Sequence, residues 1–158
     1  RFAALGVAAN FQALWAFPDD YIMNINLPAV GRDRVQAMYP IGSLHRAGAT
    51  IVGGSDWSVS SMNPLLAIET ALTRRDPTGV KLKALNVAEA VTLVDMIKAY
   101  TINGAYLAHR EDQTGRLKPG YKADLVVLGA NLFDLVPSEI GEVPITMTFF
   151  EGQKVYPK

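Results

Sequence analysis

The order of apolar segments constrains the fold of this chain most strongly. Two short apolar runs, residues 7–15 (VAANFQALW) and 49–53 (ATIVG), are each followed by helical patterns, and only strand patterns follow the last helix. The second run is β-branched, and the first is apolar apart from Asn10 and Gln12, so both are predicted to be buried strands of the kind found in parallel sheets. The sequence therefore predicts the end of a parallel α/β layer followed by a small β appendage.

Two helical segments flank the second apolar run. Residues 31–47 have a helical pattern divided by Pro40, which is expected at the first position of a short helix over 41–47. Asn63 followed by Pro64 predicts the start of a second helix. Arg74 and Arg75 come at its end, where the helix dipole favours cations, and are expected to be solvated.

Two further helices are predicted before the chain turns to strands. Thr92 with Asp95 three residues later approximates a capping box, and apolar residues at helical spacing continue to Tyr100. Asn103 is expected to cap a shorter helix that ends near His109.

The C-terminal part has strand and turn signals. Residues 123–128 (ADLVVL) are predicted to form a strand. Residues 145–150 and 153–156 are predicted to form a hairpin that turns at Glu151–Gly152.

Charge and composition exclude several classes of function. The 158 residues carry 15 Lys and Arg against 15 Asp and Glu, so no net charge attracts nucleic acid or anionic lipid. No cysteine is present, which excludes disulfides and thiolate zinc sites and leaves the redox compartment undetermined. No apolar run approaches the roughly 20 residues that span a bilayer. A soluble chain is expected, with a cytoplasmic location favoured, and its start at Arg1 suggests a piece of a longer polypeptide.

Asp56 is the leading candidate for chemistry. It follows Gly53–Gly54–Ser55 directly after the second apolar run, and parallel α/β folds place reactive groups at the carboxyl ends of their strands. An Asp after Gly–Ser is also what a plain strand-to-loop turn contains, so the tripeptide alone leaves both interpretations open.

Four polar and aromatic residues near the two strand ends are candidates for contacting a substrate. Trp57 and Ser58 follow Asp56, and Gln12 and Trp15 lie near the end of the first run. The alternative for both tryptophans is a place in the core.

Three motif blocks resemble the C-terminal portion of the amidohydrolase superfamily, in the branch of D-aminoacylase-like and N-substituted formamide deformylase-like enzymes. They are GSDWSVSSMNPLLAIETALTRRD, TLVDMIKAYTINGAYLAH and TGRLKPGYKADLVVLGANLF, in this order. The segment LGVAANFQALWAFPDD is also similar to the seventh barrel strand of that branch, with Ala13 where a proline often follows the glutamine.

The resemblance implies a fold and a chemistry. Residues 1–110 would be the last two strands and helices of a (β/α)8 barrel, and residues 111–158 part of a small β-sandwich. Members hold one or two divalent metals, with zinc favoured here, and hydrolyse amide or other C–N bonds of small molecules. Asp56 would be the last-strand aspartate that binds metal and carries a proton from the metal-bound water to the leaving nitrogen.

The ligands that accompany such an aspartate are missing from the sequence. The family needs an H-x-H pair, a further ligand that is often a modified lysine, and two more histidines, whereas this chain has only His45 and His109. His45 is expected at the end of a helix that feeds the last strand, and His109 at a helix end beyond the barrel. Since catalytic zinc usually needs three protein ligands, the chain alone is expected to be inactive.

A non-catalytic alternative remains open at this point. The chain would then be a truncated relative or a stable remnant that self-associates as a homo-oligomer through exposed strand edges.

Overall fold

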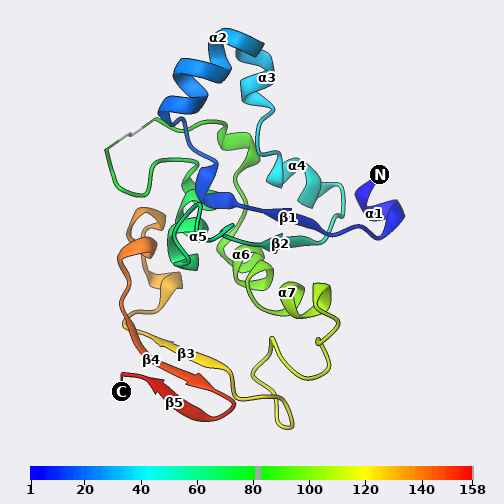
Figure 1. Cartoon of the computed structure of the whole chain (residues 1–158), viewed down its shortest axis with the longest axis vertical. Coiled ribbons are helices and arrows are strands. Elements are labelled where there is room, and N and C mark those ends of the chain that lie inside the picture. The colour runs from blue at the N-terminus through cyan, green and yellow to red at the C-terminus, as the bar shows by residue number, and fades with distance from the viewer. Residues whose placement is uncertain (81–82, 158) are drawn as a thin grey trace.

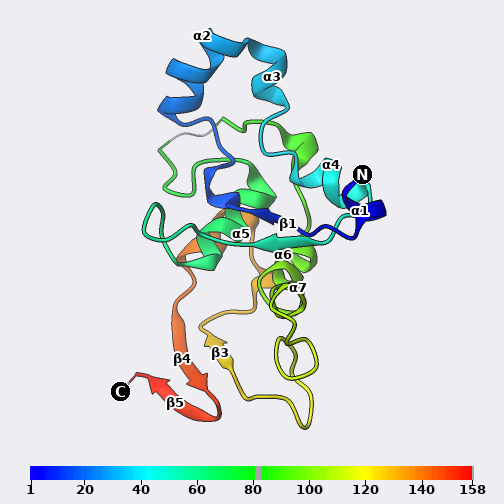
Figure 2. The same ribbon diagram turned by 45° about the vertical axis from the view of Figure 1, so that its right-hand side comes forward.

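The computed structural model describes residues 1–80 and 83–157, and a pair of parallel strands crosses its middle. Strand β1 (Ala9–Phe11) pairs in parallel with β2 (Ile51–Gly53), with Ala9 opposite Ile51 and Phe11 opposite Gly53. Both apolar runs thus contribute a strand, as predicted. Figures 1 and 2 show helices α2 and α3 on one side of this pair and α5, α6 and α7 on the other.

The two helices with clear start signals form where the sequence predicts them. Helix α5 spans Pro64–Thr73, and Oδ1 of Asn63 accepts the N–H of Leu65 at 3.0 Å. Helix α6 spans Leu93–Ala99 and begins with a complete capping box between Thr92 and Asp95. Each cap satisfies backbone donors that a helix start otherwise leaves unpaired.

The C-terminal strands form a separate antiparallel sheet in the order β3–β4–β5 (Figure 1). Its strands are β3 (Leu125–Leu128), β4 (Ile145–Phe150) and β5 (Gln153–Tyr156). The hairpin turns at Glu151–Gly152, as predicted, with both residues at positive φ. Together with the parallel pair, this sheet gives a mixed α/β fold.

The other described elements are short and connect these parts. They are α1 (Phe2–Leu5), η1 (Ala13–Trp15), η2 (Ile22–Asn26), α2 (Leu27–Val30), α3 (Arg32–Gln36), α4 (Ile41–Arg46), η3 (Val87–Glu89), α7 (Ile102–Leu107), η4 (Leu132–Asp134) and η5 (Pro137–Glu142).

The first apolar run is a shorter strand than its composition predicts. After Phe11 the chain leaves the strand, and residues 13–15 form a 3-10 turn in which the Gln12 carbonyl accepts the N–H of Trp15 at 3.1 Å. The helical segment over residues 22–30 was not predicted either, since Asn24, Asn26 and Pro28 weaken its local helix signal.

Two residues occupy places different from those predicted. Arg74 is not solvated: it is 0% exposed, and its Nη2 donates to the carbonyl of Met38 at 3.3 Å. Asn103 does not cap a helix; it lies within α7, and its Nδ2 donates to the carbonyl of Ile51 at 2.8 Å. In both cases a tertiary partner replaces the local role that the sequence indicated.

The main core fills the space between the parallel strands, α5, α6 and the C-terminal segment. Buried members of the core include Ala9, Ile41, Ile51, Leu65, Ile68, Ala71, Met96, Ala99 and Ile140.

Among the described residues, no helix is both long and apolar enough to cross a membrane.

Candidate functional site

Asp56 lies in the loop that leaves the carboxyl end of β2. The N–H of Gly54 donates to the carbonyl of Phe11 at 3.0 Å, which extends the parallel pairing by one residue before the loop begins. Asp56 has φ 51°, in the left-handed region, which Asp tolerates better than most residues. The candidate carboxylate is therefore placed just beyond the strand end, as parallel α/β folds place functional groups.

The loop forms a turn closed by its own hydrogen bonds. The Asp56 carbonyl accepts the N–H of Val59 at 2.7 Å, and the Oγ of Ser55 accepts the N–H of Trp57 at 3.2 Å. The hydroxyl of Ser60 donates to the carbonyl of Ser55. These bonds use backbone and serine atoms and leave the Asp56 side chain out.

The Asp56 side chain is exposed to solvent. Across residues 1–80 and 83–157, no hydrogen bond or ion pair involves its carboxylate oxygens. Both oxygens are accessible to a ligand or to a proton donor outside the described part of the chain.

The four predicted substrate-contacting residues lie on two segments that leave the strand pair at the same end. Trp57 is 66% exposed and Ser58 is exposed, so Trp57 lies outside the core that the described residues form. Gln12 and Trp15 are half-buried. In the described chain no hydrogen bond joins either of these two to Asp56, so the structure brings the segments to one edge without linking the side chains.

Residues beneath the Asp56 turn were not predicted as part of a site. Tyr100 packs its ring against Gly53, and its hydroxyl lies 3.4 Å from the carbonyl of Gly54, to which it donates. Asn10 of β1 lies against Gly54. The signal in the sequence was the glycine pair at a strand end, since glycine in a strand often marks a close approach by another group.

The described residues do not form a metal site by themselves. No group of three or more His, Asp and Glu side chains comes together in them. His45 pairs instead with Asp95, 3.4 Å from its Nε2, and His109 is exposed beyond the end of α7. A carboxylate is an acceptable zinc ligand, but one carboxylate is too few. A metal at Asp56 would need ligands from outside this set.

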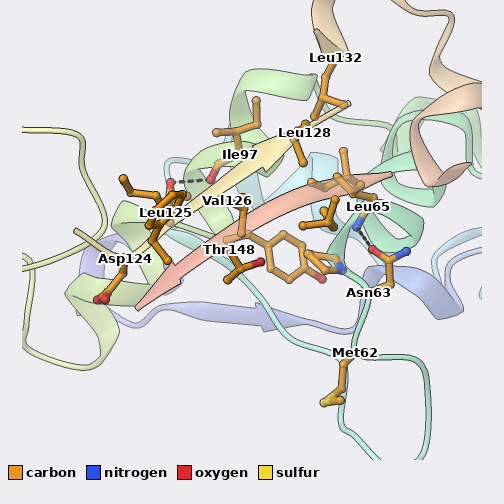
Figure 3. Close-up of a pocket in the computed structure, with 16 residues that line it drawn as sticks. Met62, Asn63, Leu65, Ile97, Asp124, Leu125, Val126, Leu128, Leu132 and Thr148 are labelled. Atoms are coloured by element: carbon orange, nitrogen blue, oxygen red, sulfur yellow. Dashed lines mark hydrogen bonds between the residues drawn. The ribbon is translucent and has the colours of Figure 1, made fainter. Parts of the chain in front are cut away.

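An apolar groove of about 760 Å³, with Tyr100 among its lining residues, lies between the helices and the C-terminal sheet (Figure 3). Met62 and Asn63 line it at one side, and Asp124 at the other. Asp124 has a structural role, because its Oδ1 accepts the N–H of Glu151 at 2.8 Å in the hairpin turn. None of the five predicted site residues lines this groove.

Comparisons with known proteins give consistent matches over the length of the chain. The model of the amidohydrolase family matches residues 1–156. The chain is 30% identical over 129 residues to the protein YtcJ of Bacillus subtilis, covering 82% of this chain and 24% of YtcJ. It is 29% identical over 115 residues to N-substituted formamide deformylase of Arthrobacter pascens, covering 73% and 21% of the two chains. The chain thus spans about a quarter of the length of these relatives.

Solved structures share the fold. An amidohydrolase from Thermotoga maritima aligns with a TM-score of 0.65 at 18% identity, over 99% of this chain and 33% of the other. An adenosine deaminase from Xanthomonas campestris with bound zinc aligns with a TM-score of 0.59 at 20% identity, over 97% of this chain and 33% of the other. With the family model matched over nearly the whole sequence, this chain belongs to the amidohydrolase family.

Proposed function

We propose that this chain is the C-terminal part of a metal-dependent hydrolase that acts on amide or other C–N bonds of small molecules. In this proposal residues 1–110 are the last strands and helices of a (β/α)8 barrel, and residues 111–158 are part of a β-sandwich beside it. The single observation that carries the proposal is the position of Asp56, an exposed carboxylate at the carboxyl end of a buried parallel strand in a chain of the amidohydrolase family.

Asp56 is proposed to serve as one ligand of the metal centre and as the proton carrier. A bound divalent metal, with zinc favoured, would make a water molecule acidic enough to react near neutral pH. The Asp56 carboxylate would accept the proton that this water loses and donate it to the departing nitrogen. The other ligands must come from polypeptide outside the described residues, so the chain alone is expected to lack turnover.

The proposed substrate contacts are Trp57, Ser58, Gln12 and Trp15. Trp57 and Ser58 follow Asp56 in its turn, and Gln12 and Trp15 lie on the segment that leaves β1 at the same edge. Support for the substrate class comes from the relatives, among them the N-substituted formamide deformylase.

The test is Asp56→Asn in the complete protein that carries this chain, assayed on a panel of N-substituted formamides and other amides. Asn adopts the left-handed conformation at least as readily as Asp, so the turn should keep its shape. We expect kcat to fall by about 10²- to 10⁴-fold with an unchanged melting temperature. Asp112→Asn, at an exposed carboxylate far along the chain, is the matched control and should retain full turnover. Wild-type turnover in Asp56→Asn would refute the role.

Two observations favour a second candidate, a non-catalytic relative. The described residues assemble no metal-ligand group, and β1 and β2 pair only with each other within them, so each strand has an open edge. Such edges favour self-association between copies. This candidate predicts a mass in sedimentation that rises with concentration, and a metal-content measurement that finds no bound metal. A monomer at all concentrations would contradict it.

A further inference from the structure

We infer that Tyr100 is a positioning residue for Asp56: its ring fixes the Gly53–Gly54 segment on which the Asp56 turn is mounted. The inference rests on the proposed function for its catalytic consequence, while its structural content stands on the contacts around the two glycines.

The two glycines expose both faces of the strand end. Successive side chains of a strand point to opposite faces, so Gly53 and Gly54 open one face each. A Cβ on Gly53 would lie 2.5 Å from the Cε2 and Cζ atoms of Tyr100, and a Cβ on Gly54 would lie 2.9 Å from Oδ1 of Asn10. The strand end is therefore held between an aromatic ring on one face and an amide on the other.

Tyr100 is itself anchored independently of the turn. It follows the last residue of α6, and its N–H donates to the carbonyl of Met96, a fully buried core residue, at 3.1 Å. The next helix adds a second tie to the same strand, because Asn103 donates to the carbonyl of Ile51 at 2.8 Å. The α6–α7 segment thus holds β2 at two points, the carbonyl of Ile51 and the Gly53–Gly54 end.

The ring contributes more to this contact than the hydroxyl. The bond from the Tyr100 hydroxyl to Gly54 is long, at 3.4 Å, whereas the ring occupies the whole position of a Gly53 side chain. Burial raises the pKa of Tyr100 to about 12, so the hydroxyl stays protonated at ordinary pH and adds no charge near Asp56.

The experiment compares Tyr100→Leu with Tyr100→Phe in the complete protein that carries this chain. The first readout is amide hydrogen exchange at Trp57 and Val59, whose N–H groups close the Asp56 turn. With Leu we expect their exchange to accelerate about tenfold or more, because the turn loses its support. The amide of Ala9, which donates to Thr50 at the other end of the strand pair, should keep its rate. With Phe all three rates should stay at wild-type values.

The second readout is kinetic. We expect Tyr100→Leu to lower kcat about 100-fold with KM within about threefold, since a small displacement of a catalytic group is sufficient for such a loss. Tyr100→Phe should keep kcat within about threefold of the wild-type value. Tyr106→Leu, at an exposed tyrosine of α7, is the control and should change neither readout.

The outcomes separate this inference from the proposed function. Unchanged exchange at Trp57 and Val59 in Tyr100→Leu, or equal acceleration at Ala9, would overturn the positioning role. Accelerated exchange confined to the turn, together with full activity in Asp56→Asn, would retain the positioning role and refute the proposed function.

Discussion

The Asp56 turn and the cluster around Arg74 differ in the exposure of their charged side chains. Asp56 is exposed, and no described residue makes a hydrogen bond or ion pair with its carboxylate. Arg74 is fully buried at the end of α5, near Glu89, which is only 7% exposed. The buried charges connect segments that are distant in sequence, whereas the exposed one is presented at a strand end. In this chain the buried charged residues Arg74 and Glu89 help to hold distant segments together. The exposed Asp56, at the carboxyl edge of the strands, belongs to the candidate site.

We define the Arg74–Glu89 cluster as Arg74, Glu89, Ser43 and Arg46. Glu89 accepts the N–H of Ser43 at 2.6 Å and also its hydroxyl, and Nη2 of Arg46 lies 3.8 Å from its Oε1. Nε and Nη1 of Arg74 are buried without a hydrogen-bond partner in the described chain. Burial lowers the pKa of Arg74 to about 10, opposed by the charge of Glu89. The Glu89 charge therefore offsets part of the cost of burying Arg74.

Replacing Glu89 by Gln should have the largest effect on stability. The amide keeps the shape but removes the charge that offsets part of the cost of burying Arg74, and it weakens the two hydrogen bonds that Ser43 donates, so we expect a loss of about 1.5–3 kcal/mol. Urea unfolding monitored by tryptophan fluorescence measures the loss. Glu139→Gln, at an exposed glutamate of η5, should stay within about 0.5 kcal/mol of wild type. Equal stability of the two variants would show that the cluster contributes nothing.

Asp95→Asn should cost less, about 1 kcal/mol near neutral pH, because this carboxylate caps a helix at the surface. Burial alone would raise the pKa of Asp95, but hydrogen bonds from Thr92 and the nearby His45 and Lys98 outweigh it and lower the pKa below 3.8. A lowered pKa in the folded state means that the stabilisation is present above pH 3.8 and is lost as pH falls through the folded pKa. The wild type and Asp95→Asn should therefore converge in acid unfolding; a constant difference down to pH 2 would disprove the charge effect.

Glu69→Gln should have the smallest effect and the opposite sign. Glu69 is 4% exposed, and its Oε2 accepts the N–H of Gly141 at 2.8 Å, a bond that a Gln carbonyl can also make. Burial raises the pKa of Glu69, so wild-type stability falls as pH rises through that pKa, and the variant avoids this loss. We expect a gain of about 0.5 kcal/mol or less at pH 7 that disappears near pH 4. Glu69→Ala, which removes the acceptor, should destabilise at both pH values.

The sequence predicted the helix starts and the turn that are formed by residues close to one another along the chain. The Asn63–Pro64 start of α5, the capping box of α6 and the turn at Glu151–Gly152 are formed by residues within three positions of each other. The strand before Asp56 was predictable because a continuous apolar run of this length is typical of a buried parallel strand.

Features set by tertiary contacts were not predictable in the same way. Arg74 has the local signature of a solvated helix end, and only the packing of residues near Met38 and Glu89 buries it. Asn103 looks like a helix cap until the carbonyl of Ile51, 52 residues away, comes within hydrogen-bond distance. The contact of Tyr100 with Gly53 likewise joins residues 47 positions apart, since the glycine pair signals a close approach without naming the group that approaches.

A crystal structure of the complete protein with its metal bound tests whether Asp56 is a metal ligand. We expect a carboxylate oxygen of Asp56 within about 2.0–2.2 Å of a zinc ion at the carboxyl ends of the strands, with the remaining ligands supplied by other segments. A structure in which the metal lies elsewhere and the Asp56 side chain faces away from it would show that Asp56 is not a metal ligand.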